Sequence, residues 1–119
     1  MIKLTLLGEP KSTNHLYKSH CRFGFPTVYM TKDGKALKES YQWQVKSQYR
    51  GEVLTGDVKM EVRLFFGTKR RQDIDNFSKL IFDCLSGIVI KDDSQITELH
   101  LFKDYCKENP RVEIIINEI

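Results

Sequence analysis

Histidine and cysteine are scarce in this 119-residue sequence, with three of each. The histidines are scattered, and the six residues together do not resemble a four-ligand zinc set, so a zinc centre is disfavoured. An odd number of cysteines without paired spacing also argues against a disulfide framework, and we expect free, buried thiols in a reducing compartment. The residues concerned are His15, His20, His100, Cys21, Cys84 and Cys106.

Long hydrophobic runs are also missing. No run approaches the roughly 20 apolar residues that span a bilayer. The first segment, residues 1–8, is too short and too regularly alternating for a signal peptide. We therefore expect a cytoplasmic protein with no membrane partner. A hydrophobic content of 40% with 29% charged residues is that of an ordinary globular protein, and the length predicts one domain, residues 1–119.

The charge is unevenly distributed along the chain. Residues 1–50 contain nine Lys or Arg and three Asp or Glu, whereas residues 51–119 contain ten and thirteen. A basic surface beside a group of carboxylates suits a polyanion held over a metal site. A solvated surface with uneven charge is the plainer alternative.

Hydrophobic periodicity predicts two main helices and four or five strands. Residues 35–50 and 77–88 have apolar stripes of helical spacing. The alternation of residues 58–66 is the clearest strand pattern, and further strands are expected at residues 2–7, 27–31, 97–105 and 111–116. Residues 9–25 read as a long loop, and Asp33-Gly34 as a turn. The order predicts a compact α+β domain with a mixed or antiparallel sheet.

Aspartates gather just before and after the second predicted helix. Asp73 and Asp75 are two apart, so in an extended chain their side chains point the same way. Asp75 also stands where the helix should begin and is a candidate N-cap. Lys79 and Asp83 continue from Asp75 at spacings of four, on the face opposite the apolar stripe.

The pair Asp92-Asp93 follows the apolar run 88–90. If this stretch is extended, only one of the two carboxylates can point at the Asp73–Asp75 group. Three or four such carboxylates suit Mg²⁺, a hard cation that prefers oxygen ligands, and Mg²⁺ held there can promote phosphodiester hydrolysis. Taken singly, Asp75 is also explained as a helix cap, Asp83 as a solvated helix residue, and Asp92-Asp93 as a turn.

The stretch 71–95 resembles the RusA family of Holliday junction resolvases. That family has a basic run, then D-[LIV]-D-N-x-x-K, a helix with F-D-x-L, a glycine and D-D-x-Q-[IV]. The corresponding residues are Lys69-Arg70-Arg71, Asp73-Ile74-Asp75-Asn76 with Lys79, Phe82-Asp83-Cys84-Leu85, Gly87 and Asp92-Asp93-Ser94-Gln95-Ile96. Pro10, Ser12 and Asn14 resemble the family's P-x-S-x-N loop. The segment between the helix and Asp92 is short and Gln72 replaces a basic residue, which bears on substrate preference more than on chemistry.

The resemblance implies a homodimer that binds four-way DNA junctions and makes paired, symmetric nicks with Mg²⁺, for which Mn²⁺ can substitute. The ends would be a 5′-phosphate and a 3′-hydroxyl, and a bacterial or phage setting suits the family. By resemblance, Asp73, Asp75 and Asp93 would be catalytic metal ligands, Asp92 an accessory ligand, and Lys79 a catalytic cation.

The predicted DNA contacts come from the basic residues and the N-terminal loop. Arg and Lys side chains contact phosphates, and aromatic rings stack on unpaired bases. Tyr17, Phe23 and Phe25 are candidates for stacking, with core packing as the alternative for the two phenylalanines. The predicted DNA-binding residues are Lys11, Asn14, Lys18, Arg22, Lys69, Arg70 and Arg71.

Three rival functions remain. One is a branched-DNA-binding protein with little nuclease activity, against which the intact carboxylates argue. Another is a Mg²⁺ nuclease that prefers flaps or forks. The third is a structural Ca²⁺ domain, which the missing EF-hand ligand spacing disfavours.

Overall fold

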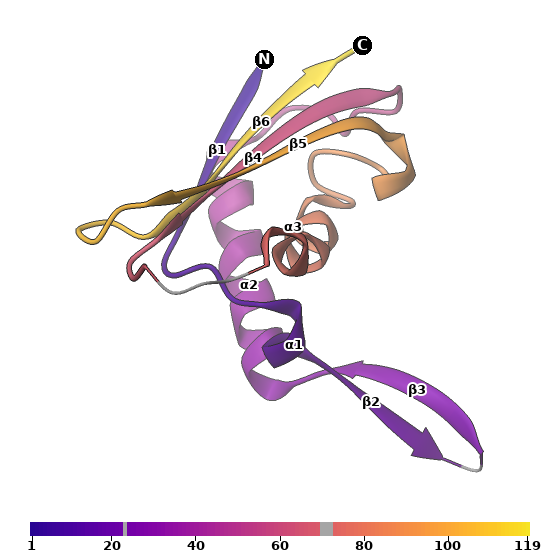
Figure 1. Cartoon of the computed structure of the whole chain (residues 1–119). Coiled ribbons are helices and arrows are strands. Elements are labelled where there is room, and N and C mark those ends of the chain that lie inside the picture. Colours follow the sequence, from indigo (N-terminus) through magenta and orange to yellow (C-terminus); the bar gives the residue numbers. More distant parts are fainter. Residues whose placement is uncertain (23, 70–72) are drawn as a thin grey trace.

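A computed structural model describes residues 1–22, 24–69 and 73–119. It is a single α+β domain, as predicted, with a four-stranded sheet, a separate hairpin and two main helices (Figure 1). The elements in chain order are β1 (Ile2–Leu7), α1 (Thr13–Leu16), β2 (Tyr17–Arg22), β3 (Phe25–Met30), α2 (Lys32–Gln48), β4 (Val58–Phe66), η1 (Ile74–Phe77), α3 (Ser78–Leu85), η2 (Asp93–Gln95), β5 (Ile96–Tyr105) and β6 (Arg111–Glu118).

The main sheet has the strand order β1-β6-β4-β5. Its pairs are antiparallel except β4 and β5, which are parallel. Val62 in β4 lies opposite Ile114 of β6 and Leu101 of β5. The parallel pair requires a crossover, which α3 supplies. The predicted mixed sheet is therefore confirmed.

One face of the sheet is buried beneath α2 and α3 (Figure 1). In β4 alternate residues are buried, as the period of a half-buried strand requires. Tyr41 and Val45 of α2 join this core, together with the apolar face of α3. Burial raises the pKa of the Tyr41 hydroxyl to about 12. The predicted apolar stripes are confirmed.

The N-terminal segment is more ordered than predicted. Residues 9–25 contain the short helix α1 and the strand β2, so the expectation of a long loop was wrong. β2 pairs antiparallel with β3 from Tyr17 opposite Met30 to Arg22 opposite Phe25. The strand expected at residues 27–31 is largely β3, but β2 was missed, because its residues do not alternate between apolar and polar. Figure 1 shows the hairpin projecting away from the sheet and helices.

The turn predicted at Asp33-Gly34 is instead the first turn of α2. Thr31 caps this helix by accepting a hydrogen bond from the Gly34 N–H at 3.1 Å. The glycine is explained by close packing, since a Cβ at Gly34 would lie 2.5 Å from the Leu16 carbonyl oxygen. A glycine needed for a close approach looks, in sequence, like a glycine needed for a turn.

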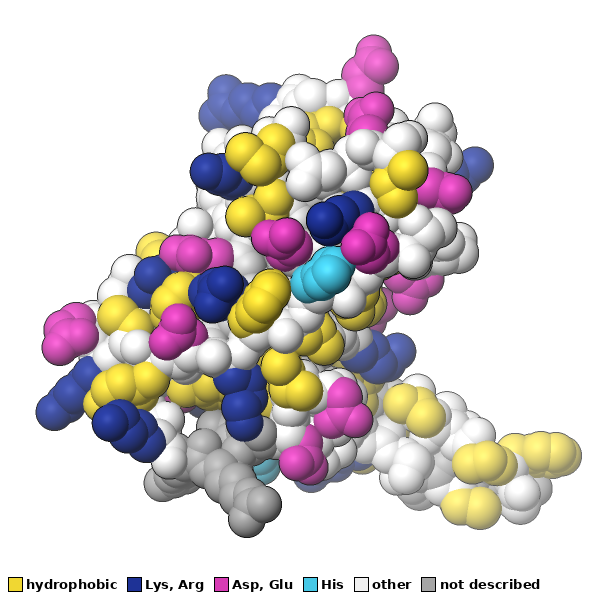
Figure 2. Space-filling model, turned by 45° about the horizontal axis from the view of Figure 1, so that its top comes forward, with side chains coloured by type: hydrophobic (Ala, Val, Ile, Leu, Met, Phe, Trp, Pro, Cys, Tyr) yellow, Lys and Arg dark blue, Asp and Glu magenta, His cyan; other side chains and the backbone are white. Residues whose placement is uncertain are grey.

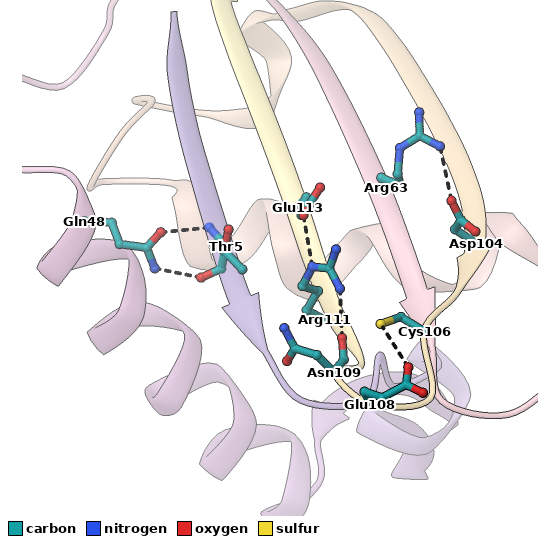
Figure 3. Close-up of polar contacts among 9 residues, drawn as sticks. All are labelled: Thr5, Gln48, Arg63, Asp104, Cys106, Glu108, Asn109, Arg111 and Glu113. Carbon is teal, nitrogen blue, oxygen red and sulfur yellow. Dashed lines mark hydrogen bonds and ion pairs between the residues drawn. The ribbon is translucent and has the colours of Figure 1, made fainter.

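Strand β1 forms one edge of the sheet, and side chains of α2 cover its outward backbone (Figure 3). The Gln48 amide accepts from the Thr5 N–H and donates to the Thr5 carbonyl, both at 2.7 Å. Gln44 accepts from the Leu7 N–H at 2.7 Å. These contacts satisfy backbone groups that an edge strand otherwise leaves open to another chain.

The cysteines are free, as predicted, but only Cys84 is buried; Cys21 is exposed and Cys106 is partly exposed. Among the described residues, no helix is long and apolar enough to cross a membrane.

Candidate active site

Asp73 and Asp75 flank the start of the 3₁₀ turn η1. Asp73 is extended and precedes the turn, whereas Asp75 lies inside it. The extended conformation that would point both carboxylates the same way therefore holds for Asp73 and not for Asp75. The cap prediction is also wrong, because the turn begins at Ile74 and no side chain caps it.

The burial of η1 explains why both carboxylates face solvent. Residues three apart share a face of a 3₁₀ turn. Ile74 is half-buried and Phe77 is buried, with its ring packed edge-to-face on Phe66 at 5.1 Å. Asp73 and Asp75 are left exposed. In the described part of the chain, neither carboxylate has a hydrogen bond or an ion pair with another residue.

Lys79 lies in the first turn of α3, one turn after Asp75. Its Nζ is 4.9 Å from the centroid of the Tyr17 ring, at the range of a cation–π contact. The Tyr17 hydroxyl in turn donates to Asp83 Oδ2 at 2.6 Å. Burial, then the hydrogen bond to Asp83, raise the pKa of the Tyr17 hydroxyl. The base of the hairpin is thus joined to the helix that contains Lys79.

Two expectations change with this contact. Asp83 is half-buried and bonded to Tyr17 rather than solvated. Tyr17 is half-buried with its hydroxyl engaged, rather than a ring presented to bases. Sequence reasoning missed its link to α3, since 66 residues separate Tyr17 from Asp83. Helix α3 also ends at Leu85, earlier than predicted, and Gly87 follows with a positive φ of 87°.

Asp93 begins the short 3₁₀ turn η2, and Asp92, whose backbone is extended, precedes it. Asp92 caps η2 by accepting from the Ser94 N–H at 3.2 Å. Hydrogen bonds from Ser94 hold the pKa of the Asp92 carboxyl below its usual range. The turn interpretation of this pair is confirmed for Asp93, which is exposed in the turn, whereas Asp92 is extended and caps it.

Gln95 fixes this turn, and sequence reasoning gave it no role. Its Oε1 accepts from the N–H groups of Lys91 and Asp92 at 2.7 and 2.8 Å. Its Nε2 donates to the carbonyls of Leu54 and Gly56, both at 2.8 Å. A buried amide with four bonds is a structural clamp. The only sequence signal was its place in the D-D-x-Q motif.

The two acidic segments lie toward opposite ends of β4. Gln95 ties the Asp93 turn to Leu54 and Gly56, just before β4 begins, whereas Phe77 packs against Phe66, where β4 ends. Within residues 1–22, 24–69 and 73–119, no three His, Cys, Asp or Glu side chains are arranged to hold a metal ion. Asp73 and Asp75 are neighbours; the participation of Asp93 stays a prediction.

The predicted DNA-binding residues lie on several elements. Lys11 is exposed beside a hollow of about 600 Å³ between α1 and α2, which His15 and Asp33 also line. Asn14 is exposed on α1 and Lys18 on β2, and Lys69 Nζ lies 5.1 Å from the Tyr105 ring centroid. Arg70, Arg71, Phe23 and the side chain of Arg22 lie outside the described residues.

The uncovered face of the sheet differs from these surfaces because its charges are mixed (Figure 2). Arg63 pairs with Asp104 at 3.7 Å and Arg111 with Glu113 at 2.9 Å. The same two arginines lie over the rings of Phe102 and Phe65. The hydrogen bond to Glu113 raises the pKa of Arg111. Neutralised by its own carboxylates, this face is poorly suited to a polyanion.

Comparison with known proteins gives consistent matches over nearly the whole chain. The protein YqaN of Bacillus subtilis, described as uncharacterized, is 31% identical, with 99% of this chain and 96% of the relative covered. The crossover junction endodeoxyribonuclease RusA of Aquifex aeolicus is 26% identical over 95% of this chain and 86% of its own. The enzyme of the same name from Escherichia coli K12 is 27% identical, with 95% and 92% covered.

The family model described as Endodeoxyribonuclease RusA matches residues 8–117 of this chain. This span includes the hairpin, the Asp73–Lys79 segment and the Gln95 turn. With that coverage, and with the fold and motif agreeing, the chain belongs to the RusA endodeoxyribonuclease family.

Proposed function

We propose that this protein is a Mg²⁺-dependent endonuclease that resolves four-way DNA junctions by paired, symmetric nicks. The observation that supports this most directly is the pair of exposed carboxylates of Asp73 and Asp75, which have no partner among the described residues and lie one helical turn from Lys79. Family membership supplies the activity class, and the curated relatives named as crossover junction endodeoxyribonucleases suggest the substrate.

The donor set fits a hard divalent cation. Mg²⁺ is commonly held by one or two carboxylates, with water and substrate phosphates completing six oxygen ligands. Asp73 and Asp75 provide two carboxylates free of other described contacts. Asp93, with Asp92 as accessory, is proposed as a further ligand on the motif alone, because its turn lies toward the other end of β4. Bound there, Mg²⁺ or Mn²⁺ would offset phosphate charge and make water a better nucleophile.

The residues of the chain then have separate tasks. A water oxygen bonds to phosphorus, the bond to the 3′ oxygen breaks, and that oxygen takes a proton. The products are a 5′-phosphate and a 3′-hydroxyl. Lys79, held over the Tyr17 ring by α3, offsets the negative charge that develops on the phosphoryl oxygens.

The proposed substrate is branched DNA, bound by a homodimer. Symmetric cuts in two equivalent strands require two identical sites, which a two-fold dimer supplies. Lys69, Arg70 and Arg71, which precede Asp73, and the N-terminal Lys11, Asn14, Lys18 and Arg22 are the proposed phosphate contacts.

The test is a gel assay with a synthetic four-way junction and a linear duplex of the same sequence, in Mg²⁺ and then in Ca²⁺. We expect paired nicks in the junction with Mg²⁺, and binding without cutting with Ca²⁺. Junction binding with no cleavage in Mg²⁺ or Mn²⁺ would indicate a binding protein. Faster cutting of flaps or forks would replace the proposed substrate.

A further inference from the structure

The hairpin β2–β3 exposes large apolar side chains that nothing in the described chain covers. Phe25 is 73% exposed, Val28 64% and Tyr29 48%. The alternative of core packing for Phe25 is therefore wrong. Exposed apolar groups gathered on a projecting element indicate a binding surface, because scattered single residues are the norm elsewhere.

The segment that forms this surface contains basic residues and no acidic ones. From Pro10 to Lys32 the chain has four Lys or Arg and no Asp or Glu. Figure 2 shows hydrophobic side chains and no acidic ones on the hairpin, at the lower right, in contrast to the mixed charges of the sheet. A polyanion is thus the favoured occupant over a protein surface of mixed charge.

The register places basic and aromatic residues on one side of the hairpin. Lys18 lies directly opposite Tyr29, and opposite residues of an antiparallel pair share a face. Phe25 is four residues from Tyr29 in the same strand, so it points to that face as well. Rings among cations are the usual composition of surfaces that stack on nucleic-acid bases.

The dimensions also suit DNA. Each strand has six residues, so the hairpin reaches about 20 Å at roughly 3.3 Å per residue. A two-stranded ribbon fits a major groove about 12 Å wide.

The base of the hairpin is fastened beside the candidate active site. The Thr31 N–H donates to the Leu16 carbonyl at 2.8 Å, which closes the base. Tyr17, the first hairpin residue, is bonded to Asp83 of α3, the helix that contains Lys79. DNA bound along the hairpin would therefore run towards Asp73, Asp75 and Lys79.

We propose that hairpin β2–β3 is a DNA-binding arm that recognises the branch of the substrate, with Lys18 at a phosphate and Phe25 and Tyr29 stacked on bases exposed at the branch point. This rests on the proposed function for its substrate. The arm would distinguish branched DNA from duplex. The acidic site and the basic run do not provide this discrimination.

The experiment compares Phe25→Ala, Tyr29→Ala and the double variant with the unchanged protein in Ca²⁺. Fluorescence anisotropy would measure the Kd for a four-way junction and for linear duplex. We expect the double variant to bind the junction at least about tenfold more weakly, from lost stacking on one or more bases, and to bind duplex within about threefold. A 2-aminopurine at the branch point should be quenched by the unchanged protein and not by the double variant.

Trp43→Ala is the matched control, because Trp43 is 69% exposed on α2, outside the arm; its junction Kd should not change. Phe25→Trp should retain binding, since the ring is kept. Equal junction affinity in the double variant, or equal losses for junction and duplex, would overturn the proposal. So would conversion of a dimer to a monomer in sedimentation, which would assign the apolar surface to a second copy.

The outcome is separable from that of the proposed function. Loss of junction affinity in the arm variants, with no cleavage by the unchanged protein in Mg²⁺, would keep the arm and reject the nuclease. If the unchanged protein cleaves junctions in Mg²⁺ and the arm variants bind junctions with unaltered affinity, the nuclease would be kept and the arm rejected. Circular dichroism melts would verify that each variant folds, as expected for exposed positions.

Discussion

Asp73 and Asp75 are exposed because Ile74 and Phe77 turn the opposite side of η1 into the core. Their position is thus maintained by packing and does not depend on the carboxylates themselves. Asp73→Asn or Asp75→Asn should therefore leave the fold unchanged and lower junction cleavage by at least about a hundredfold, through loss of a metal ligand. Single-turnover cleavage in Mg²⁺ and junction binding in Ca²⁺ would measure the two effects.

The matched control is Asp57→Asn, an exposed aspartate outside the site, which should cut at the original rate. Cleavage within threefold of the original in both site variants would remove these carboxylates from the chemistry. Loss of folding or of binding would also count against the assignment.

Cys84 is the buried thiol of α3, and burial raises its pKa to about 12. A raised folded pKa favours the folded state below the unfolded pKa, near 9, and this contribution is lost as the pH rises from about 9 towards 12. We expect the Tm of the protein to fall over that range, and to fall less in Cys84→Ala. Thermal melts at pH 8, 10 and 11 would compare the two slopes; equal slopes would show that Cys84 contributes nothing.

At the scale of elements, the turn containing Asp93 depends on one side chain. Gln95→Ala would remove a partner from the Gly56 carbonyl and from the Asp92 N–H, and would leave the Leu54 carbonyl and the Lys91 N–H with only the 3.3 Å bond between them. Urea unfolding should show a loss of about 2–4 kcal/mol, given the cost of unsatisfied buried groups. Gln95→Glu should be similarly damaging, because a carboxylate cannot donate to the two carbonyls.

Gln42→Ala provides the comparison. Gln42 is half-buried on α2 without a side-chain hydrogen bond in the described chain, and its loss should stay within about 0.5 kcal/mol. Similar losses for Gln42→Ala and Gln95→Ala would mean that the turn is held by other contacts.

The elements also show where sequence patterns suffice. β4 and α2 were predictable because their apolar residues recur at the periods of a strand and a helix. In the hairpin, the strand expected at residues 27–31 is largely β3, but β2 was missed, since the hairpin has no buried face to impose a pattern. The Asp73–Lys79 segment was recognised by motif, but the Tyr17–Asp83 contact and the Gln95 clamp join residues distant in sequence, which spacing does not reveal.

For the whole molecule, the charge pattern predicts how DNA binding responds to salt. Phosphate contacts release counterions, so log K should fall with log[salt] with a slope of about −0.9 per contact. Lys18→Ala should make the slope about one unit shallower. Titrations of junction affinity from low to moderate salt would show this. Lys46→Ala, an exposed lysine in the last turn of α2, should leave the slope unchanged, and an unchanged slope in Lys18→Ala would place the DNA elsewhere.

The glutamine side chains of α2 that bond to the edge of β1 limit how copies of this protein can assemble. With the Gln48 amide occupying both backbone groups of Thr5 and Gln44 occupying the Leu7 N–H, a second chain cannot extend the sheet at β1 without displacing α2. A dimer would therefore have to form through side chains or through β5, the other edge of the sheet. A dimer formed through side chains keeps two separate sheets, so the spacing of the two proposed active sites could match that of two strands at a junction.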